Sequence, residues 1–232
     1  YEFNTGIVAI IDKIPVVGIY GGTFDPIHYG HLRIAEELLD IIGLSRVIFV
    51  PSGAPRLRAV PEASKHHRSE MIRLAIQGNS LFSLDEREIN RPGMSTTVES
   101  LREYRSEWGR NAVLIFIVGI DAFRKINQWH HWRELFDLCH IIVVPRPGYL
   151  SVDDHQNLPE EIRTELIARC VLDAKDLKLQ THGAIYTAQT SLLEISATQI
   201  RSLISMGRSI RYLLPENVSD YIKINHLYAG KT

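Results

Sequence analysis

The sequence predicts an α/β fold, a doubly wound parallel sheet with a small helical part at the C-terminal end. Short apolar runs alternate with amphipathic segments along most of the 232 residues, which is the pattern of repeated strand–helix–strand units. The apolar runs are continuous rather than alternating, as expected for strands covered on both faces. Because ligands of such sheets bind at the carboxyl ends of the strands, the segments that follow each strand are the places to search for chemistry.

The predicted elements follow one another in order. Residues 16–21 form an apolar run that ends in glycines, and residues 32–42 carry apolar side chains at helical spacing up to Gly43, a natural helix end. Residues 46–51 (RVIFVP) are a second buried run. The other predicted strands are 81–84, 112–119 and 140–145, and the other predicted helices are 67–77, 95–108, 132–138, 159–170, 197–206 and 217–224. We expect residues 16–232 to form one domain, preceded by an N-terminal extension, residues 1–15, with no assigned role.

The composition excludes several classes of partner. Lysine and arginine number 26 and aspartate and glutamate 27, so the net charge is −1. No overall field favours a nucleic acid or an anionic membrane, and any phosphate binding has to be local. No apolar run is long enough to span a membrane. Cys139 and Cys170 have neither metal-binding nor redox spacing, so we expect two buried thiols in a reducing compartment, the cytoplasm.

A glycine–histidine motif joins the first strand to the first helix, in residues 21–32 (GGTFDPIHYGHL). Gly21 and Gly22 allow the backbone to approach a ligand closely, because neither has a Cβ. His28 and His31 can share one face of a helix start, where unpaired N–H groups attract anions. The alternative is a tight turn with capping or packing histidines. The combination favours a site for a phosphate in transfer, although it is neither a Walker A loop nor a dinucleotide-binding fingerprint.

A second motif occupies residues 195–201 (ISATQIR). Ser196 followed by Gln199 is a capping box that predicts a helix start at about residue 197. Thr198 adds a hydroxyl in the first turn, and Arg201 follows one turn later. A helix N-terminus with hydroxyls and a guanidinium suits a triphosphate tail, whereas the alternative is an ordinary capped surface helix.

Together the two motifs resemble the signature of the nucleotidylyltransferase superfamily, and more narrowly that of bacterial nicotinate mononucleotide adenylyltransferases. The matching elements are GGTFDP with HYGH in residues 21–31, and the Ile-Ser-x-Thr-x-Ile-Arg pattern of residues 195–201. The resemblance extends over nearly the whole chain from Val16. Class I aminoacyl-tRNA synthetases share a related His-x-Gly-His element, but they are usually much longer and their second motif differs.

The resemblance implies a Rossmann-like nucleotidylyltransferase fold and a reaction. AMP would pass from ATP to nicotinate mononucleotide, giving nicotinate adenine dinucleotide and pyrophosphate in NAD biosynthesis. Mg²⁺ would arrive with ATP, and no protein metal site is expected, since the adjacent pairs His66-His67 and His130-His131 do not complete one. The alternatives are adenylyl transfer to nicotinamide mononucleotide or phosphopantetheine, and a non-catalytic nucleotide-binding regulator.

The resemblance also assigns candidate roles. His28 and His31 would contact the α- and β-phosphates, with His31 the stronger candidate for a transition-state contact. Asp121 would hold a ribose, and Trp129 would stack on the pyridine, unless it is a half-buried core residue. The candidate ATP-binding residues are Gly21, Gly22, Thr23, Phe24, Asp121, Ser196, Thr198 and Arg201, and those for the pyridine nucleotide are Arg58, Thr97, Trp129 and Arg146.

Two segments depart from the family pattern. Residues 54–58 (APRLR) stand where the family often has Pro-Pro-His followed by Lys or Arg, and Arg58 is expected to take over the basic position. Residues 94–97 (MSTT) replace Pro-Ser-Tyr-Thr, so Thr96 stands in place of a tyrosine. Both departures concern the substrate loops rather than the reaction.

Overall fold

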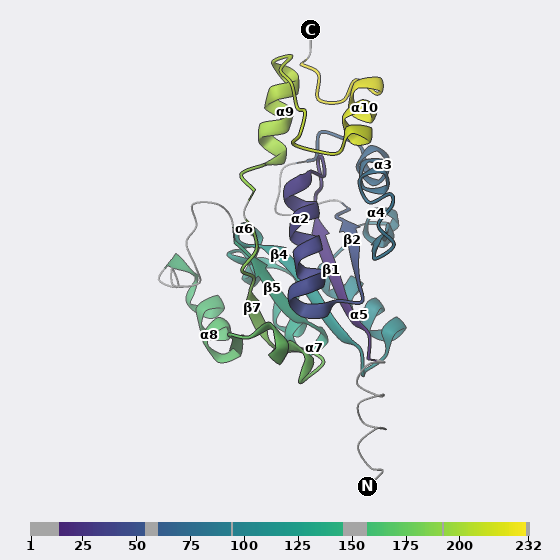
Figure 1. Ribbon diagram of the computed structural model, residues 1–232. Helices are drawn as coiled ribbons and strands as arrows, with labels where there is room; N and C mark the ends of the chain where they lie inside the picture. The colour runs from purple at the N-terminus through teal and green to yellow at the C-terminus, as the bar shows by residue number, and fades with distance from the viewer. Residues whose placement is uncertain (1–13, 54–59, 94, 146–156, 192, 231–232) are drawn as a thin grey trace.

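The computed structural model describes residues 14–53, 60–93, 95–145, 157–191 and 193–230. Its centre is a seven-stranded parallel sheet with the order β3-β2-β1-β4-β5-β7-β6 (Figure 1). From β1 the chain builds β2 and β3 on one side and then β4 and β5 on the other, so the order reverses between β1 and β4. Such a switch point opens a crevice at the carboxyl ends of the two strands. The strands are β1 (Val16–Gly22), β2 (Arg46–Pro51), β3 (Phe82–Leu84), β4 (Val113–Gly119), β5 (His140–Val144), β6 (Cys170–Val171) and β7 (Ile185–Thr187).

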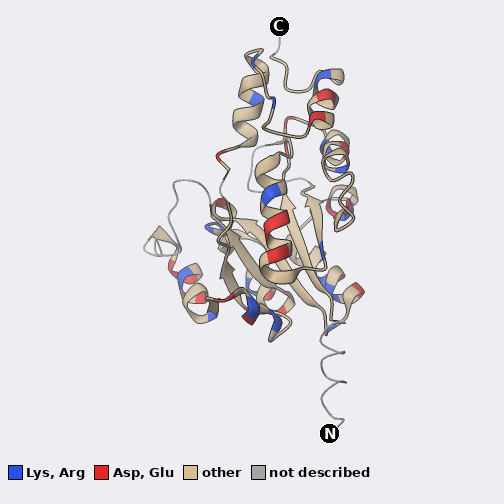
Figure 2. Cartoon of the chain, in the orientation of Figure 1, with Lys and Arg blue, Asp and Glu red and all other residues tan. Residues whose placement is uncertain are grey.

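Helices cover both faces of the sheet and divide the core into two hydrophobic clusters. Along β1, Val16 and Tyr20 belong to one cluster and Val17 and Ile19 to the other, which explains why the predicted strands are apolar without alternation. Figure 2 shows the strands almost without charged residues, whereas the helices carry most of them. The first cluster is covered by α2 (Tyr29–Leu38), α3 (Lys65–Ala75), α9 (Ala197–Ser205) and α10 (Glu216–Ile224), and the second by α5 (Thr97–Trp108), α6 (Ile120–Phe123), α7 (Leu135–Leu138) and α8 (Glu160–Arg169).

The first helix is longer than predicted at its start. It begins at Tyr29, with His28 as its N-cap, and it continues into a π-helical turn over Leu39–Gly43. Gly43 has φ +69, the left-handed conformation that ends helices and that glycine adopts without strain. The predicted helix 132–138 is divided into a 3₁₀ turn, Trp132–Glu134, and the short α7.

Several short elements were not predicted, among them α4 (Arg87–Asn90), β6 and β7. Each of these three has two to four residues, which is too few to show a helical or strand period. The predicted C-terminal helical part is confirmed as α9 and α10, which lie beyond the carboxyl ends of β1 and β2 (Figure 1). The start of α2 is tied to this part, since the Tyr29 N–H donates to the Leu213 carbonyl at 3.0 Å.

The cysteine prediction is half wrong. Cys139 is buried, and burial raises the pKa of its thiol to about 12. Cys170 is exposed, because it begins the edge strand β6. Most of the predicted N-terminal extension, residues 1–13, lies outside the described residues. Among the residues described, no helix combines the length and the apolar composition needed to cross a membrane.

Candidate active site

The two histidines of the first motif meet at the start of α2. His28 is the N-cap and His31 the third residue of the helix. Their rings are stacked, with centroids 3.8 Å apart and planes at 27°. The His28 backbone N–H donates to His31 Nδ1 at 3.3 Å, so the neutral His31 ring carries its proton on Nε2. The prediction that both side chains share one face of the helix start is confirmed.

The glycines of this motif are required by aromatic packing inside the protein. A Cβ on Gly21 would lie 2.9 Å from the Phe116 ring, and one on Gly22 would lie 2.8 Å from the Phe24 ring. Gly30 has the same constraint, because its Cβ would lie 2.9 Å from Nδ1 of His28. Close approach to a ligand is therefore not the only reason for glycine here. The glycines let the histidine and phenylalanine rings pack directly on the loop.

Phe24 is a core residue rather than a surface contact. Its side chain is 2% exposed, and its ring packs edge-on against His31 at 5.0 Å and Tyr20 at 5.7 Å. Its φ of +50 is rare for a residue with a Cβ, and it turns the chain sharply after β1. Any contact of Phe24 with ATP would have to use its backbone, because its ring is packed against His31 in the core.

Asp25 anchors the loop that carries the histidines. Its buried carboxylate accepts hydrogen bonds from the Glu62 N–H at 2.8 Å, the Ala63 N–H at 3.1 Å and the Tyr228 hydroxyl at 2.6 Å. Burial, and after it the neighbouring Asp25 carboxylate, raises the pKa of the Tyr228 phenol. The hydroxyl therefore stays protonated and donates. The loop is thereby fixed to two segments that are distant in the sequence.

A buried arginine on α3 completes this anchoring. Arg68 is 1% exposed, and it donates from Nη1 to the Thr23 carbonyl at 2.8 Å and from Nη2 to the Ser52 carbonyl at 2.9 Å. It therefore joins the loop after β1 to the loop after β2. Burial lowers the pKa of the guanidinium, while the Asp25 carboxylate opposes that shift. Sequence reasoning missed Arg68, because an arginine on an amphipathic helix is usually exposed.

The second motif lies beside the first. Ser196 Oγ accepts from the Gln199 N–H at 3.1 Å, so the predicted start of α9 at Ala197 is confirmed. Thr198 and Ser196 are exposed. The guanidinium of Arg201 donates from Nη1 to the Asp25 carbonyl at 2.8 Å and from Nε to Glu62 at 2.6 Å. Residues that are 176 positions apart in the sequence thus meet at one edge of the sheet.

A cavity of about 400 Å³ opens between the carboxyl ends of β1, β2 and β4 and the start of α5. Four predicted site residues line it: Gly21, Gly22, Thr97 and Trp129. The half-buried Trp129 ring lies 6.0 Å from that of Phe116, in an edge-to-face contact. Asp121 follows β4 in α6 at the same edge of the sheet. The remaining candidates, Arg58 and Arg146, lie outside the described residues.

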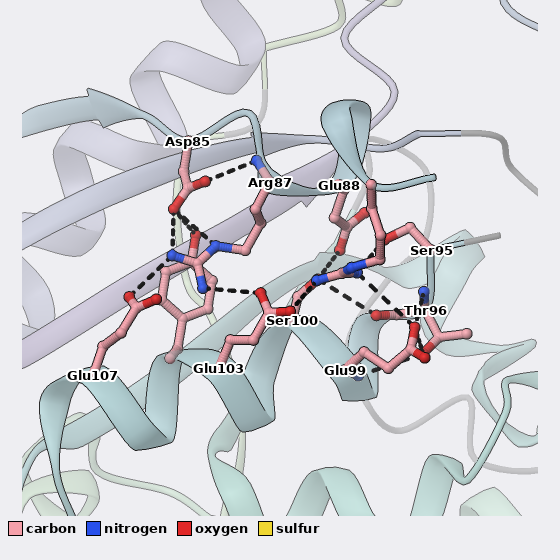
Figure 3. Close-up of polar contacts among 11 residues, drawn as sticks. Asp85, Arg87, Glu88, Ser95, Thr96, Glu99, Ser100, Glu103 and Glu107 are labelled. Carbon is pink, nitrogen blue, oxygen red and sulfur yellow. Dashed lines mark hydrogen bonds and ion pairs between the residues drawn. The ribbon is translucent and has the colours of Figure 1, made fainter. Parts of the chain in front are cut away.

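A network of charged side chains between α4 and α5 supports one wall of this cavity (Figure 3). Arg91 donates to Ser95 Oγ at 2.5 Å, to Ser100 Oγ at 3.2 Å and to Glu103 at 2.7 Å. Ser100 Oγ donates in turn to the Glu88 carboxylate at 2.9 Å. Three members of the network line the cavity: Glu88, Ser95 and Ser100. The network therefore fixes the position of this wall. Burial raises the pKa of Glu88, against the hydrogen bond from Ser100 and the charge of Arg91.

A second arginine extends the network away from the cavity. Arg87 pairs with Asp85 at 2.6 Å and with Glu107 at 3.0 Å, and its guanidinium lies 3.6 Å from the centre of the Tyr104 ring. The Tyr104 hydroxyl donates to Asp85 at 2.8 Å. These contacts join α5 to the end of β3, and the individual sequence positions gave no sign of them.

Comparison with known proteins identifies the family. The pattern of the cytidylyltransferase-like family matches residues 19–203. A probable nicotinate-nucleotide adenylyltransferase of Dechloromonas aromatica (strain RCB) is 43% identical over 91% of this chain and 97% of its own. One of Serratia proteamaculans (strain 568) is 44% identical over 94% of this chain and 97% of its own. The chain belongs to the nicotinate-nucleotide adenylyltransferases. The Plasmodium falciparum nicotinic acid mononucleotide adenylyltransferase complexed with NaAD has the same fold, with a TM-score of 0.69 and 20% identity over 92% of this chain and 97% of that one.

Thr96, the residue that replaces the expected tyrosine, caps α5. Its Oγ1 accepts from the Glu99 N–H at 3.4 Å, and the Glu99 carboxylate accepts from the Thr96 N–H at 3.1 Å. The Thr96 hydroxyl also donates to that carboxylate at 2.9 Å, and these hydrogen bonds lower the pKa of Glu99. The Thr-x-x-Glu spacing of residues 96–99 is readable in the sequence as a capping box, but the sequence analysis did not use it.

The described parts of this adenylyltransferase include no group of three or more histidine, cysteine, aspartate or glutamate side chains arranged to hold a metal ion. Beside the two histidines, the Asp25 carboxylate already accepts three hydrogen bonds. The site therefore offers imidazoles, hydroxyls, backbone N–H groups and a guanidinium, which are donors that suit phosphate oxygens.

Proposed function

We infer that this chain transfers the adenylyl group of ATP to nicotinate mononucleotide, which gives nicotinate adenine dinucleotide and pyrophosphate in NAD biosynthesis. The observation that carries the inference is the meeting of both motifs at one sheet edge, beside a cavity with an aromatic wall. The relatives of 43–44% identity bear the name of this activity. A regulator without activity would have no need for both histidines and Arg201.

In the proposed reaction a phosphate oxygen of the mononucleotide attacks the α-phosphorus of ATP. The new P–O bond forms as the bond from the α-phosphorus to the bridging oxygen breaks, and pyrophosphate leaves with that oxygen. Such a transfer needs in-line positioning and stabilisation of charge on the phosphoryl oxygens, rather than covalent help from the protein. The two stacked imidazoles of His28 and His31, at the start of α2, are suited to that charge.

The outer phosphates of ATP would bind at the start of α9. Ser196 and Thr198 are exposed there, and Arg201 lies one turn further along. Arg201 Nε donates to the Glu62 carboxylate. For Arg201 to bind a phosphate, this hydrogen bond has to break and the phosphate has to take the place of Glu62. Asp121 would accept from a ribose hydroxyl. We assign the divalent ion to Mg²⁺. It would neutralise negative charge on the triphosphate and would be held by phosphate oxygens and water.

The pyridine ring would occupy the cavity beside Trp129, with Thr97 and the start of α5 facing its substituent. The apolar surfaces of Phe116 and Trp129 suit a flat ring, and the start of the helix offers backbone N–H groups to a carboxylate. Arg58 and Arg146, in segments outside the described residues, remain proposed contacts for the mononucleotide phosphate.

The test is to incubate the protein with ATP, Mg²⁺ and one of three acceptors: nicotinate mononucleotide, nicotinamide mononucleotide or phosphopantetheine. Mass spectrometry identifies the product, and a coupled assay measures released pyrophosphate. We expect nicotinate adenine dinucleotide and stoichiometric pyrophosphate with the first acceptor. Product with phosphopantetheine alone would overturn the assignment of the acceptor, and the absence of pyrophosphate with all three would indicate a regulator.

A further inference from the structure

The C-terminal segment contacts the first motif through the side chain of Tyr228. The Tyr228 hydroxyl donates to Asp25 Oδ1 at 2.6 Å, across 203 positions of sequence. Both residues are buried, and Tyr228 packs within the hydrophobic cluster that covers one face of β1. In the residues before Tyr228, α10 ends at Ile224 and is followed by the C-cap Asn225.

The backbone around Tyr228 is held in an unfavourable conformation. His226 has φ +51 and Tyr228 has φ +60, in the left-handed region that residues with a Cβ avoid. Such conformations persist where the surrounding contacts fix them, and they concentrate at functional sites. Here the conformation of the chain delivers a phenol hydroxyl to a carboxylate of the phosphate-binding loop.

We propose that Tyr228 is a positioning residue for adenylyl transfer, which acts through Asp25 to hold the loop that carries His28 and His31. The proposal rests on the function proposed above. Asp25 stands three residues before His28, and its carbonyl accepts from Arg201 at 2.8 Å. One residue thus connects the C-terminal segment, the histidine loop and the arginine of α9. Tyr228 touches no reacting atom, so its effect on the reaction has to pass through this connection.

The substitution Tyr228→Phe isolates the hydrogen bond, because the ring that packs in the core is retained. Asp25 Oδ1 then keeps only the longer bond from Ala63, at 3.1 Å. A matched control is Tyr221→Phe on α10, which removes the hydroxyl that bonds to His67 Nδ1 at 2.9 Å, away from the histidine loop. Both variants lose one tyrosine hydroxyl from the same C-terminal part.

The first measurement is kcat and KM for both substrates, well below the melting temperature. Tyr228→Phe should lower kcat about tenfold or more with each KM within about twofold, since small displacements of catalytic groups cost rate rather than affinity. Tyr221→Phe should keep a kcat near that of the wild type. In the Asp25→Ala background, adding Tyr228→Phe should change kcat less than about twofold, because the acceptor of the Tyr228 hydroxyl is already removed. A kcat for Tyr228→Phe within about twofold of wild type, or an equal loss in Tyr221→Phe, would overturn the proposal.

The second measurement does not depend on turnover. Hydrogen–deuterium exchange of peptides that cover residues 22–31 should be faster in Tyr228→Phe than in the wild type, and unchanged in Tyr221→Phe. Unaltered exchange in this loop contradicts the proposal even where kcat has fallen. If the wild type forms no dinucleotide, the proposed function fails on its own, and the exchange comparison still decides whether Tyr228 orders the loop.

Discussion

The two ends of the site are built in different ways. At the proposed phosphate end, around His28 and His31, the proposed catalytic groups come from a single stretch, residues 21–31. Four separate segments hold that stretch through side-chain or backbone atoms of Thr23 and Asp25. At the pyridine end the cavity draws its walls from β1, β2, β4, α4, α5 and the segment of Trp129. One of those walls depends on ion pairs and hydrogen bonds between side chains of α4 and α5 (Figure 3).

This difference indicates where change is tolerated. The phosphate end uses backbone geometry that a glycine or a buried aspartate fixes, so substitutions there should damage the reaction itself. The pyridine end can exchange a tyrosine for Thr96 because the new hydroxyl caps α5 and preserves the start of the helix. We therefore expect changes at the pyridine end to alter acceptor binding and selectivity while adenylyl transfer continues.

The largest effect should follow from His31→Ala at the phosphate end. Removing one positioned group that stabilises developing charge typically lowers kcat about 10²–10³-fold, with a much smaller change in ATP affinity. Steady-state kinetics with saturating substrates measures the loss, and the exposed His66→Ala on α3 is the control that should stay near wild type. A variant of His31 that keeps more than about a third of wild-type kcat would remove His31 from the reaction.

The pyridine end should show its selectivity in a preference for nicotinate over nicotinamide mononucleotide. A carboxylate accepts hydrogen bonds from the N–H groups at the start of α5, whereas the NH₂ of a carboxamide can only donate. Because the Thr96–Glu99 capping box fixes this helix start, we expect kcat/KM for the acid to be about 10²-fold higher or more. The comparison uses both mononucleotides at one ATP concentration. Equal kcat/KM values would show that the start of α5 does not distinguish the two pyridine substituents.

The Arg91→Ala substitution separates the two ends. It removes the donor that ties Ser95 and Ser100 to Glu103, and it leaves the half-buried Glu88 carboxylate with Arg87 as its remaining positive neighbour. KM for nicotinate mononucleotide should rise about five- to twentyfold, because the charge-assisted hydrogen bonds of Arg91 no longer hold the cavity wall in place. KM for ATP should change little.

The matched control for this variant is Arg102→Ala on α5. Arg102 pairs with Glu134 at 2.6 Å at the surface, with 48% of its side chain exposed, and such pairs contribute little. We expect wild-type kinetics from it. A comparable rise of both Michaelis constants in Arg91→Ala would mean that the network supports the whole domain rather than one end of the site.

The smallest effect should come from Glu62→Gln at the phosphate end. The Glu62 carboxylate is paired with the guanidinium of Arg201, and under the proposed function ATP would have to displace it. With 57% of the Glu62 side chain exposed the pair is weak, so its loss should lower KM for ATP only about two- to threefold without changing kcat. The control is Asp220→Asn, which breaks a pair with Lys223 in which the carboxylate side chain is as exposed as that of Glu62. An increased KM for ATP would indicate that Glu62 supports Arg201 instead of competing with the phosphates.

The sequence by itself determined the features that depend on near neighbours. The bounds of β2 are those that the apolar run predicted, and the carboxyl ends of β1 and β4 fall within one residue of prediction. The shared face of His28 and His31 and the start of α9 also follow from local spacing. Strand and helix periods, helix caps and glycine turns act over a few residues, so a single segment contains the information.

Only the tertiary structure decided which side chains hold those segments together. The contacts of Asp25 with Arg201 and Tyr228 span 176 and 203 positions, and no local pattern specifies such pairs. Burial of Arg68 and exposure of Cys170 depend on what packs against α3 and β6. The strands β6 and β7 are too short to show a period, and they exist because their neighbours in the sheet provide hydrogen bonds. Long-range pairing is set by how the helices pack on the sheet, and that packing is a property of the whole chain rather than of any segment.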